Sequence, residues 1–139
     1  MLEKPAQDAD LVSPRPPATI LLIDDDEDSR VMYSAVLMRA GYRVLFARNG
    51  ADGVDIATHT RPDLILMDLV MPRLNGYAAL RGLRDDPVTA RIPVIALTGQ
   101  VSQAEAPQVK EAGFEDVLVK PILPQRVLTA VQRILMDAS

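Results

Sequence analysis

Short, unbroken runs of aliphatic residues alternate with longer amphipathic segments from Thr19 onward. Runs of this length between Gly, Pro or charged residues are typical of strands, and the amphipathic segments are typical of helices. The pattern predicts five strands, at 20–23, 43–46, 64–67, 93–97 and 117–119. It predicts a helix after each strand, at 28–39, 51–58, 76–84, about 105–112 and 125–136.

Five repeats of strand and helix predict an α/β fold, a doubly wound parallel sheet with helices on both faces. Strands buried on both faces read as continuous aliphatic runs, and ILLI, LILM and VIAL have that character. Gly41 and Gly113 stand just past two predicted helices, and Asp26 and Asp28 suit the start of the first. Because a proline inside a helix removes a backbone hydrogen bond, Pro107 predicts a short fourth helix that begins near residue 106.

The first 18 residues lack this periodicity and are rich in proline, with Pro5, Pro14, Pro16 and Pro17. They predict a flexible N-terminal arm over 1–18, followed by one folded domain over 19–139.

The composition narrows the kinds of site that the chain can build. With no cysteine among 139 residues, disulfides, thiol catalysis and cysteine-ligated metals are excluded. The net charge of -4, without a dense basic run, argues against binding to nucleic acid. No apolar run approaches the ~20 residues that span a bilayer, and the first residues do not resemble a secretory signal, so we expect a cytoplasmic protein.

The histidine and the methionines are expected to have no part in the chemistry of a site. The only histidine, His59, lies near the end of the second predicted helix and is expected to face solvent. The methionines are expected to pack in the core, among them Met32, Met38, Met67 and Met71.

Acidic and other polar side chains stand at the ends of four predicted strands. Asp24 and Asp25 follow the first strand, Asp68 the third, Thr98 the fourth and Lys120 the fifth. Open parallel sheets bind ligands beyond the carboxyl ends of their strands. Carboxylates gathered there repel each other unless a cation lies among them, and oxygen-only ligands favour Mg²⁺.

This set of side chains suits phosphoryl transfer onto Asp68, because a carboxylate can form an acyl phosphate. Lys120 can pair with Asp68 before transfer and with a phosphoryl oxygen afterwards, and Thr98 offers a hydroxyl to another oxygen. Taken singly, Lys120 could be a surface lysine and Asp68 the cap of a turn, and Thr98 alone is uninformative. Helix-start roles explain Asp26 and Asp28 but leave Asp24 and Asp25 unexplained. The joint position of these side chains at four strand ends favours a site.

Four segments in order, ILLIDDDE, PDLILMDLVMPRLNGYAAL, IPVIALTG and VLVKPI, closely resemble the receiver domain of bacterial two-component response regulators. The resemblance covers about residues 19–136. It implies a flavodoxin-like (βα)5 fold with strand order 2-1-3-4-5 and the function of a phosphorylation-dependent signalling switch. Because the chain ends at Ser139, we expect a stand-alone receiver similar to the chemotaxis regulators.

The resemblance also implies roles for single residues. Asp68 is expected to be the phosphoacceptor, with Thr98 as the switch hydroxyl and Lys120 as a contact of the phosphoryl group. The expected Mg²⁺ ligands are Asp24, Asp25, Asp68 and the backbone carbonyl of Val70. The peptide bond between Lys120 and Pro121 is expected to be cis.

The resemblance further implies that Gly99 stands where a bulky side chain would restrict access to the site. The chain departs from the family at Val117, three residues before Lys120, where an aromatic residue or histidine is usual. A branched aliphatic side chain cannot swing a ring between two positions. We therefore expect phosphorylation to be signalled through shifts of loops and of the helix at 105–112, without an aromatic gate.

The resemblance implies a sensor histidine kinase or a histidine phosphotransfer protein as phosphoryl donor. It implies a protein target, so far unknown, that binds the face made by 105–112, 117–119 and 125–136, on a monomer or weak dimer that binds neither nucleic acid nor membrane. We expect a phosphoacceptor rather than an enzyme.

Three alternatives stay open. One is a Mg²⁺-dependent phosphohydrolase with an aspartyl nucleophile, although such enzymes commonly carry an acid where this chain has Val70. Another is an interaction module that works without phosphorylation. The third is a receiver excised from a larger hybrid kinase or regulator.

Overall fold

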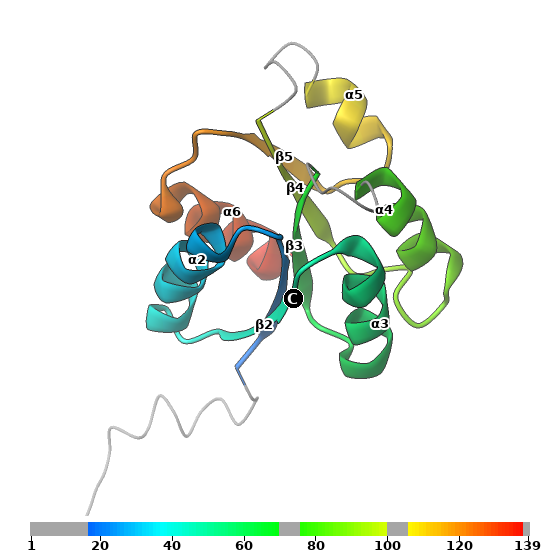
Figure 1. Cartoon of the computed structure of the whole chain (residues 1–139), viewed down its shortest axis with the longest axis horizontal. Coiled ribbons are helices and arrows are strands. Elements are labelled where there is room, and N and C mark those ends of the chain that lie inside the picture. Colours follow the sequence, from blue (N-terminus) through cyan, green and yellow to red (C-terminus); the bar gives the residue numbers. More distant parts are fainter. Residues whose placement is uncertain (1–16, 70–75, 100–105, 138–139) are drawn as a thin grey trace, which may run out of the picture.

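Figure 1 shows a computed structural model in which a central sheet is covered by helices on both faces. The structure describes residues 17–69, 76–99 and 106–137. Its strands are β1 (Thr19–Ile23), β2 (Arg43–Ala47), β3 (Leu64–Asp68), β4 (Val94–Thr98) and β5 (Asp116–Val119). Its helices are α2 (Glu27–Arg39), α3 (Gly50–Thr60), α4 (Gly76–Asp85), α5 (Ala106–Glu111) and α6 (Pro124–Asp137).

Every predicted strand and helix is present, with ends that differ from the prediction by at most two residues. Most of the predicted N-terminal arm, residues 1–16, lies outside the described residues, so the boundary between arm and domain stays a prediction. Among the described helices, none is both long enough and apolar enough to cross a bilayer.

The five strands are parallel and follow the order β2-β1-β3-β4-β5, as predicted. The register places Leu22 of β1 beside Phe46 of β2 and beside Leu66 of β3. Because all strands run in one direction, their carboxyl ends meet at a single edge of the sheet.

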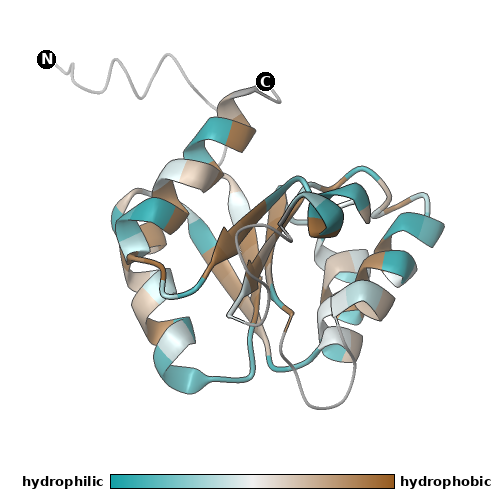
Figure 2. Cartoon of the chain, turned by 90° about the horizontal axis from the view of Figure 1, so that it is seen from above, coloured by the Kyte–Doolittle hydropathy of each residue, from teal (hydrophilic) through white to brown (hydrophobic). Residues whose placement is uncertain are grey.

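Two hydrophobic cores lie on opposite faces of the sheet. Ile20 and Leu22 of β1 pack in the core that α2 and α6 cover, whereas Leu21 and Ile23 pack in the core beneath α3, α4 and α5. Successive strand residues thus enter different cores, which explains why the strands read as unbroken aliphatic runs. Figure 2 shows the resulting hydrophobic centre between helices whose surfaces are more hydrophilic.

The predicted helix ends are confirmed. The Asp26 side chain accepts a hydrogen bond from the Ser29 N–H and caps α2, whose first turn also holds Asp28. Gly41 follows this helix with a φ of 100°, a left-handed conformation that glycine adopts without strain. The helix α5 is short and begins at Ala106, which leaves Pro107 in its first turn.

The prediction that the methionines pack in the core is confirmed for Met67, which is fully buried, and is wrong for three others, of which Met136 near the end of α6 is 74% exposed. Met32 and Met38 on α2 are 43% and 59% exposed. This helix buries Tyr33 and Leu37, which lie one turn apart on the same side, so both methionines point away from the sheet. Met71 lies outside the described residues.

Candidate functional site

Four of the predicted site residues lie together at the carboxyl edge of the sheet. Asp68 is the last residue of β3 and Thr98 the last residue of β4. Asp24 directly follows β1 and Lys120 directly follows β5. Since β1, β3, β4 and β5 are neighbours in that order, these residues form a continuous row across the sheet.

Backbone hydrogen bonds hold this row in place beyond the ends of the strands. The Asp24 N–H donates to the Ala47 carbonyl at 3.0 Å, and the Lys120 N–H donates to the Thr98 carbonyl at 2.7 Å. The Leu69 N–H, one residue past Asp68, donates in the same way to Leu97 at 2.9 Å. The ladders therefore continue through the site and fix the backbone that carries its side chains.

Three carboxylates gather in this row. Asp24, Asp25 and Asp68 each offer an oxygen, and these oxygens lie within 4.8 Å of one another. Asp24 is fully buried and Asp68 is nearly so, whereas Asp25 is exposed. The predicted acidic trio is thus assembled, with one member open to solvent.

Asp24 is in an unfavourable position when no cation is bound. Its Oδ1 accepts the Asp26 N–H at 2.9 Å, but its buried Oδ2 has no hydrogen-bond partner among the described residues. Burial raises the pKa of Asp24 to about 6, and the nearby charge of Asp68 adds to the increase. A buried oxygen without a donor, close to other carboxylates, fits a hard divalent cation such as Mg²⁺.

Lys120 compensates part of the negative charge. Its Nζ lies 3.0 Å from Asp68 Oδ2 and donates a hydrogen bond to it. Burial opposes the ammonium charge, yet the hydrogen bond with Asp68 and the charges of Asp68 and Asp24 leave the pKa of Lys120 raised. This amine stays protonated at neutral pH and can stabilise anionic oxygens next to Asp68.

Thr98 is buried in the row between the strand of Asp68 and the strand that leads to Lys120. The next residue, Gly99, is exposed, and a Cβ built there would lie 3.5 Å from the Cβ of Lys120. Glycine therefore leaves the approach to Lys120 open. The predicted cis peptide between Lys120 and Pro121 is confirmed.

Two valines were also singled out in the sequence, and the structure describes only one of them. Val117 lies in β5, half-buried, and packs against the core beneath α3, α4 and α5. Val70, predicted to offer a carbonyl to the cation, lies outside the described residues.

The sequence did not point to Arg30, which supports the site from α2. Its Nη1 donates to the backbone carbonyl of Asp24 at 2.7 Å and so fixes the turn that carries the acidic pair. The only signal in the sequence was a basic residue one turn into the helix that follows the acids. His59, by contrast, is exposed on α3, as predicted.

Comparison with known proteins points in the same direction as the geometry. The sequence model of the response regulator receiver domain matches residues 20–132. The chain is 39% identical to protein PilH of Pseudomonas aeruginosa over 118 residues, which cover 85% of this chain and 98% of PilH. It is 31% identical to the polar-differentiation response regulator DivK of Brucella anthropi, over 88% of this chain and 99% of DivK.

Solved structures share the fold. The chemotaxis protein CheY4 of Vibrio cholerae is 32% identical, with a TM-score of 0.77 over 84% of this chain and 98% of that one. The receiver domain of the sensor histidine kinase PA1611 of Pseudomonas aeruginosa is 34% identical, with a TM-score of 0.77 over 86% of this chain and 98% of that one. That structure holds a magnesium ion in its active-site cleft.

Proposed function

The chain belongs to the response regulator receiver family, and on this premise we propose that it is a signalling switch whose phosphoacceptor is Asp68. One observation carries the choice of this residue. Asp68 is the buried carboxylate that lies between the unpartnered Asp24 Oδ2 and the ammonium of Lys120. On one side of this nucleophile Lys120 can stabilise the charge of an incoming phosphoryl group, and on the other side Asp24 can hold a cation that would do the same.

In the proposed reaction, a carboxylate oxygen of Asp68 attacks the phosphorus atom of the donor. A new O–P bond forms, the bond between phosphorus and the donor breaks, and the donor leaves with that electron pair. The product is an acyl phosphate on Asp68. Receiver domains take the phosphoryl group from histidine kinases or phosphotransfer proteins, and we expect a protein of one of these two kinds to be the donor.

Asp24, Asp25 and Asp68, with the carbonyl of Val70, are the proposed ligands of Mg²⁺. When bound, this ion supplies positive charge that neutralises the phosphoryl oxygens. The chain's own contribution is to hold the ligands: Arg30 fixes the backbone at Asp24, and the Leu69 N–H fixes the end of β3.

After transfer, Lys120 is expected to leave the Asp68 carboxylate and donate to a phosphoryl oxygen, since both acceptors lie within reach of one flexible side chain. The Thr98 hydroxyl is the proposed donor to a second phosphoryl oxygen. Because Val117 has no ring to move, we propose that loop movement and shifts of α5 carry the signal to the face formed by α5, β5 and α6. On this face we expect a protein target to bind a monomer or weak dimer in the cytoplasm.

The proposal is tested by incubating the protein with Mg²⁺ and acetyl phosphate and then measuring its intact mass. Wild type is expected to gain one phosphoryl group, and Asp68→Asn is expected to gain none. Asp85→Asn, at an exposed position at the end of α4, is a matched control that should be labelled like wild type. Addition of EDTA should abolish labelling of every variant.

Two results would contradict the proposal. Labelling that persists in Asp68→Asn would place the phosphoacceptor elsewhere. Repeated turnover of an unrelated phosphomonoester, abolished by the same substitution, would instead indicate a phosphohydrolase.

A further inference from the structure

The outer edge of β2 is an open edge of the sheet. This strand pairs with β1 on one side, and the described residues place no strand on its other side. The Arg43 N–H and the Ala47 carbonyl both bond toward β1. Because the direction of backbone groups alternates along a strand, the N–H and C=O groups of Val44 and Phe46 point outward.

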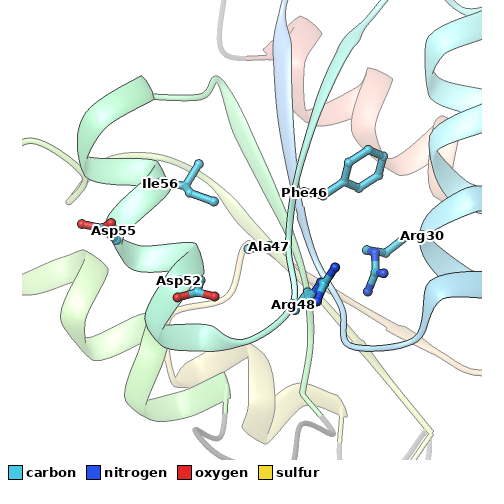
Figure 3. Close-up of a pocket in the computed structure, with 7 residues that line it drawn as sticks. All are labelled: Arg30, Phe46, Ala47, Arg48, Asp52, Asp55 and Ile56. Carbon is cyan, nitrogen blue, oxygen red and sulfur yellow. The ribbon is translucent and has the colours of Figure 1, made fainter.

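A hollow of about 600 Å³ lies along the carboxyl half of this edge. Figure 3 shows its lining on the two sides of the strand. Arg30, Arg48 and Phe46 lie on the side of α2, whereas Asp52, Asp55 and Ile56 lie on the side of α3.

The two sides of the hollow thus differ in charge. The α2 side presents two guanidinium groups around the ring of Phe46, which is 44% exposed. The α3 side presents two carboxylates beside Ile56, and that of Asp52 accepts a hydrogen bond from the neutral side-chain amide of Asn49 at 3.2 Å. A ligand at this edge therefore meets cations on one face and anions on the other.

We propose that the outer edge of β2 binds an extended segment of a partner protein, which adds to the sheet as a further strand. The outward backbone groups of Val44 and Phe46 supply its main-chain hydrogen bonds. Since alternate side chains of a strand point to opposite faces, the segment carries acidic or apolar residues facing Arg30, Arg48 and Phe46. The residues between them are basic and face Asp52 and Asp55.

The same charges disfavour a second copy of this chain as the occupant. Two β2 strands that pair antiparallel about a two-fold axis keep equivalent faces on the same side. The carboxyl half of each strand would then lie opposite the amino half of the other. Since β2, RVLFA, carries no acidic side chain to place against Arg30 and Arg48, a different chain with alternating charges fits better.

The absence of cysteine makes a sensitive test available. The variant Arg43→Cys places a single thiol at the exposed start of β2. The probes are two ten-residue peptides in which Glu and Lys alternate around a central Val. One peptide has a single cysteine at its N-terminus and the other has a single cysteine at its C-terminus. The control peptides have the same composition, with all Glu grouped in one half and all Lys in the other. Disulfide formation with each peptide is measured by intact mass in a thiol buffer at equilibrium.

The alternating peptide is expected to label Arg43→Cys roughly fivefold more than the grouped peptide, owing to its favourable cross-strand charge pairs. Adding Arg48→Glu should remove this preference, whereas Arg39→Glu, an equal charge change at the far end of α2, should keep it. In the conjugate, hydrogen exchange at the amides of Val44 and Phe46 should slow. Equal labelling by both peptides, or unprotected amides at these two residues, would overturn the proposal. The assay needs no phosphorylation, so its outcome is independent of the role of Asp68.

Discussion

The ammonium of Lys120 donates to Asp68 Oδ2 at 3.0 Å, although β4 lies between the strands that lead to the two residues. The pair therefore connects the ends of β3 and β5 above Thr98. Lys120 is the only cation among the residues of this row, and it lies within the electrostatic influence of the two most buried acids, Asp68 and Asp24. Lys120 stabilises this edge of the sheet when no Mg²⁺ is bound.

Replacing Lys120 by Met keeps the length of the side chain and removes its charge. Without Mg²⁺, the free energy of unfolding is expected to fall by roughly 1–2 kcal/mol, because Asp68 loses a charged donor while its neighbours still repel it. Excess Mg²⁺ should narrow the difference from wild type, since the ion supplies positive charge to the same carboxylates. Urea unfolding with and without Mg²⁺ measures both quantities. Equal stability of the two proteins in EDTA would show that Lys120 does not compensate the acids.

The pH dependence of stability is expected to report on Asp24. Its pKa is raised from 3.8 to about 6 in the folded state, so folding favours the protonated acid. The resulting stabilisation is complete below pH 3.8 and is lost as the pH rises through 6. Relative to Asp24→Asn, metal-free wild type should lose about 2–3 kcal/mol of unfolding free energy between pH 4 and 7.

The measurement is urea unfolding of both proteins in EDTA across that pH range. The comparison with Asp24→Asn removes the contributions of the other carboxylates to the pH dependence. One of these is Asp26, because its hydrogen bonds with Ser29 lower the pKa of its carboxyl group. Parallel pH profiles for the two proteins would show that Asp24 is not strained by its burial.

The fold and the row of site residues could be predicted because both depend on residue type at strand positions. A parallel strand buried on two faces needs an aliphatic run, and its carboxyl end is where the run stops, as at Met67 and Asp68. Strand ends that gather at one edge then bring their polar residues together without further information.

Two other features could not be predicted, for different physical reasons. The helix α2 carries apolar residues on several sides, so its pattern did not show that Met38 faces solvent while Leu37 is buried. Hydrogen bonds from Arg30 and Arg84 go to backbone carbonyls, which every residue possesses. Such contacts leave no complementary residue type in the sequence.

Arg84 is expected to stabilise the segments that enclose the core beneath α3, α4 and α5. Its guanidinium donates to the carbonyls of Ala90 and Ile92 in the connection to β4, and to the carbonyl of Gly113 after α5. Arg84→Met keeps the aliphatic stem and should cost about 2–3 kcal/mol of unfolding free energy, since three carbonyls lose a charged donor. Arg81→Met, an exposed position of the same helix, should change stability by less than about 0.5 kcal/mol. Similar losses in both variants would indicate a general effect of charge on α4.

Gly53 and Gly82 should respond in opposite directions to substitution by alanine. A Cβ at Gly53 in α3 would clash with Ile23 Cδ1 and lie 2.8 Å from its Cγ1, so the helix or the Ile23 side chain must shift. A Cβ at Gly82 in α4 would meet only Val54, at 3.7 Å or more. Alanine favours a helix over glycine by up to about 1 kcal/mol. Gly82→Ala should therefore raise the free energy of unfolding by about 0.3–1 kcal/mol. Gly53→Ala should lose about 1–3 kcal/mol despite the same gain, because overpacking outweighs it. Thermal and urea unfolding of the two variants distinguish these effects, and a stabilised Gly53→Ala would show that α3 can move away from β1 at little cost.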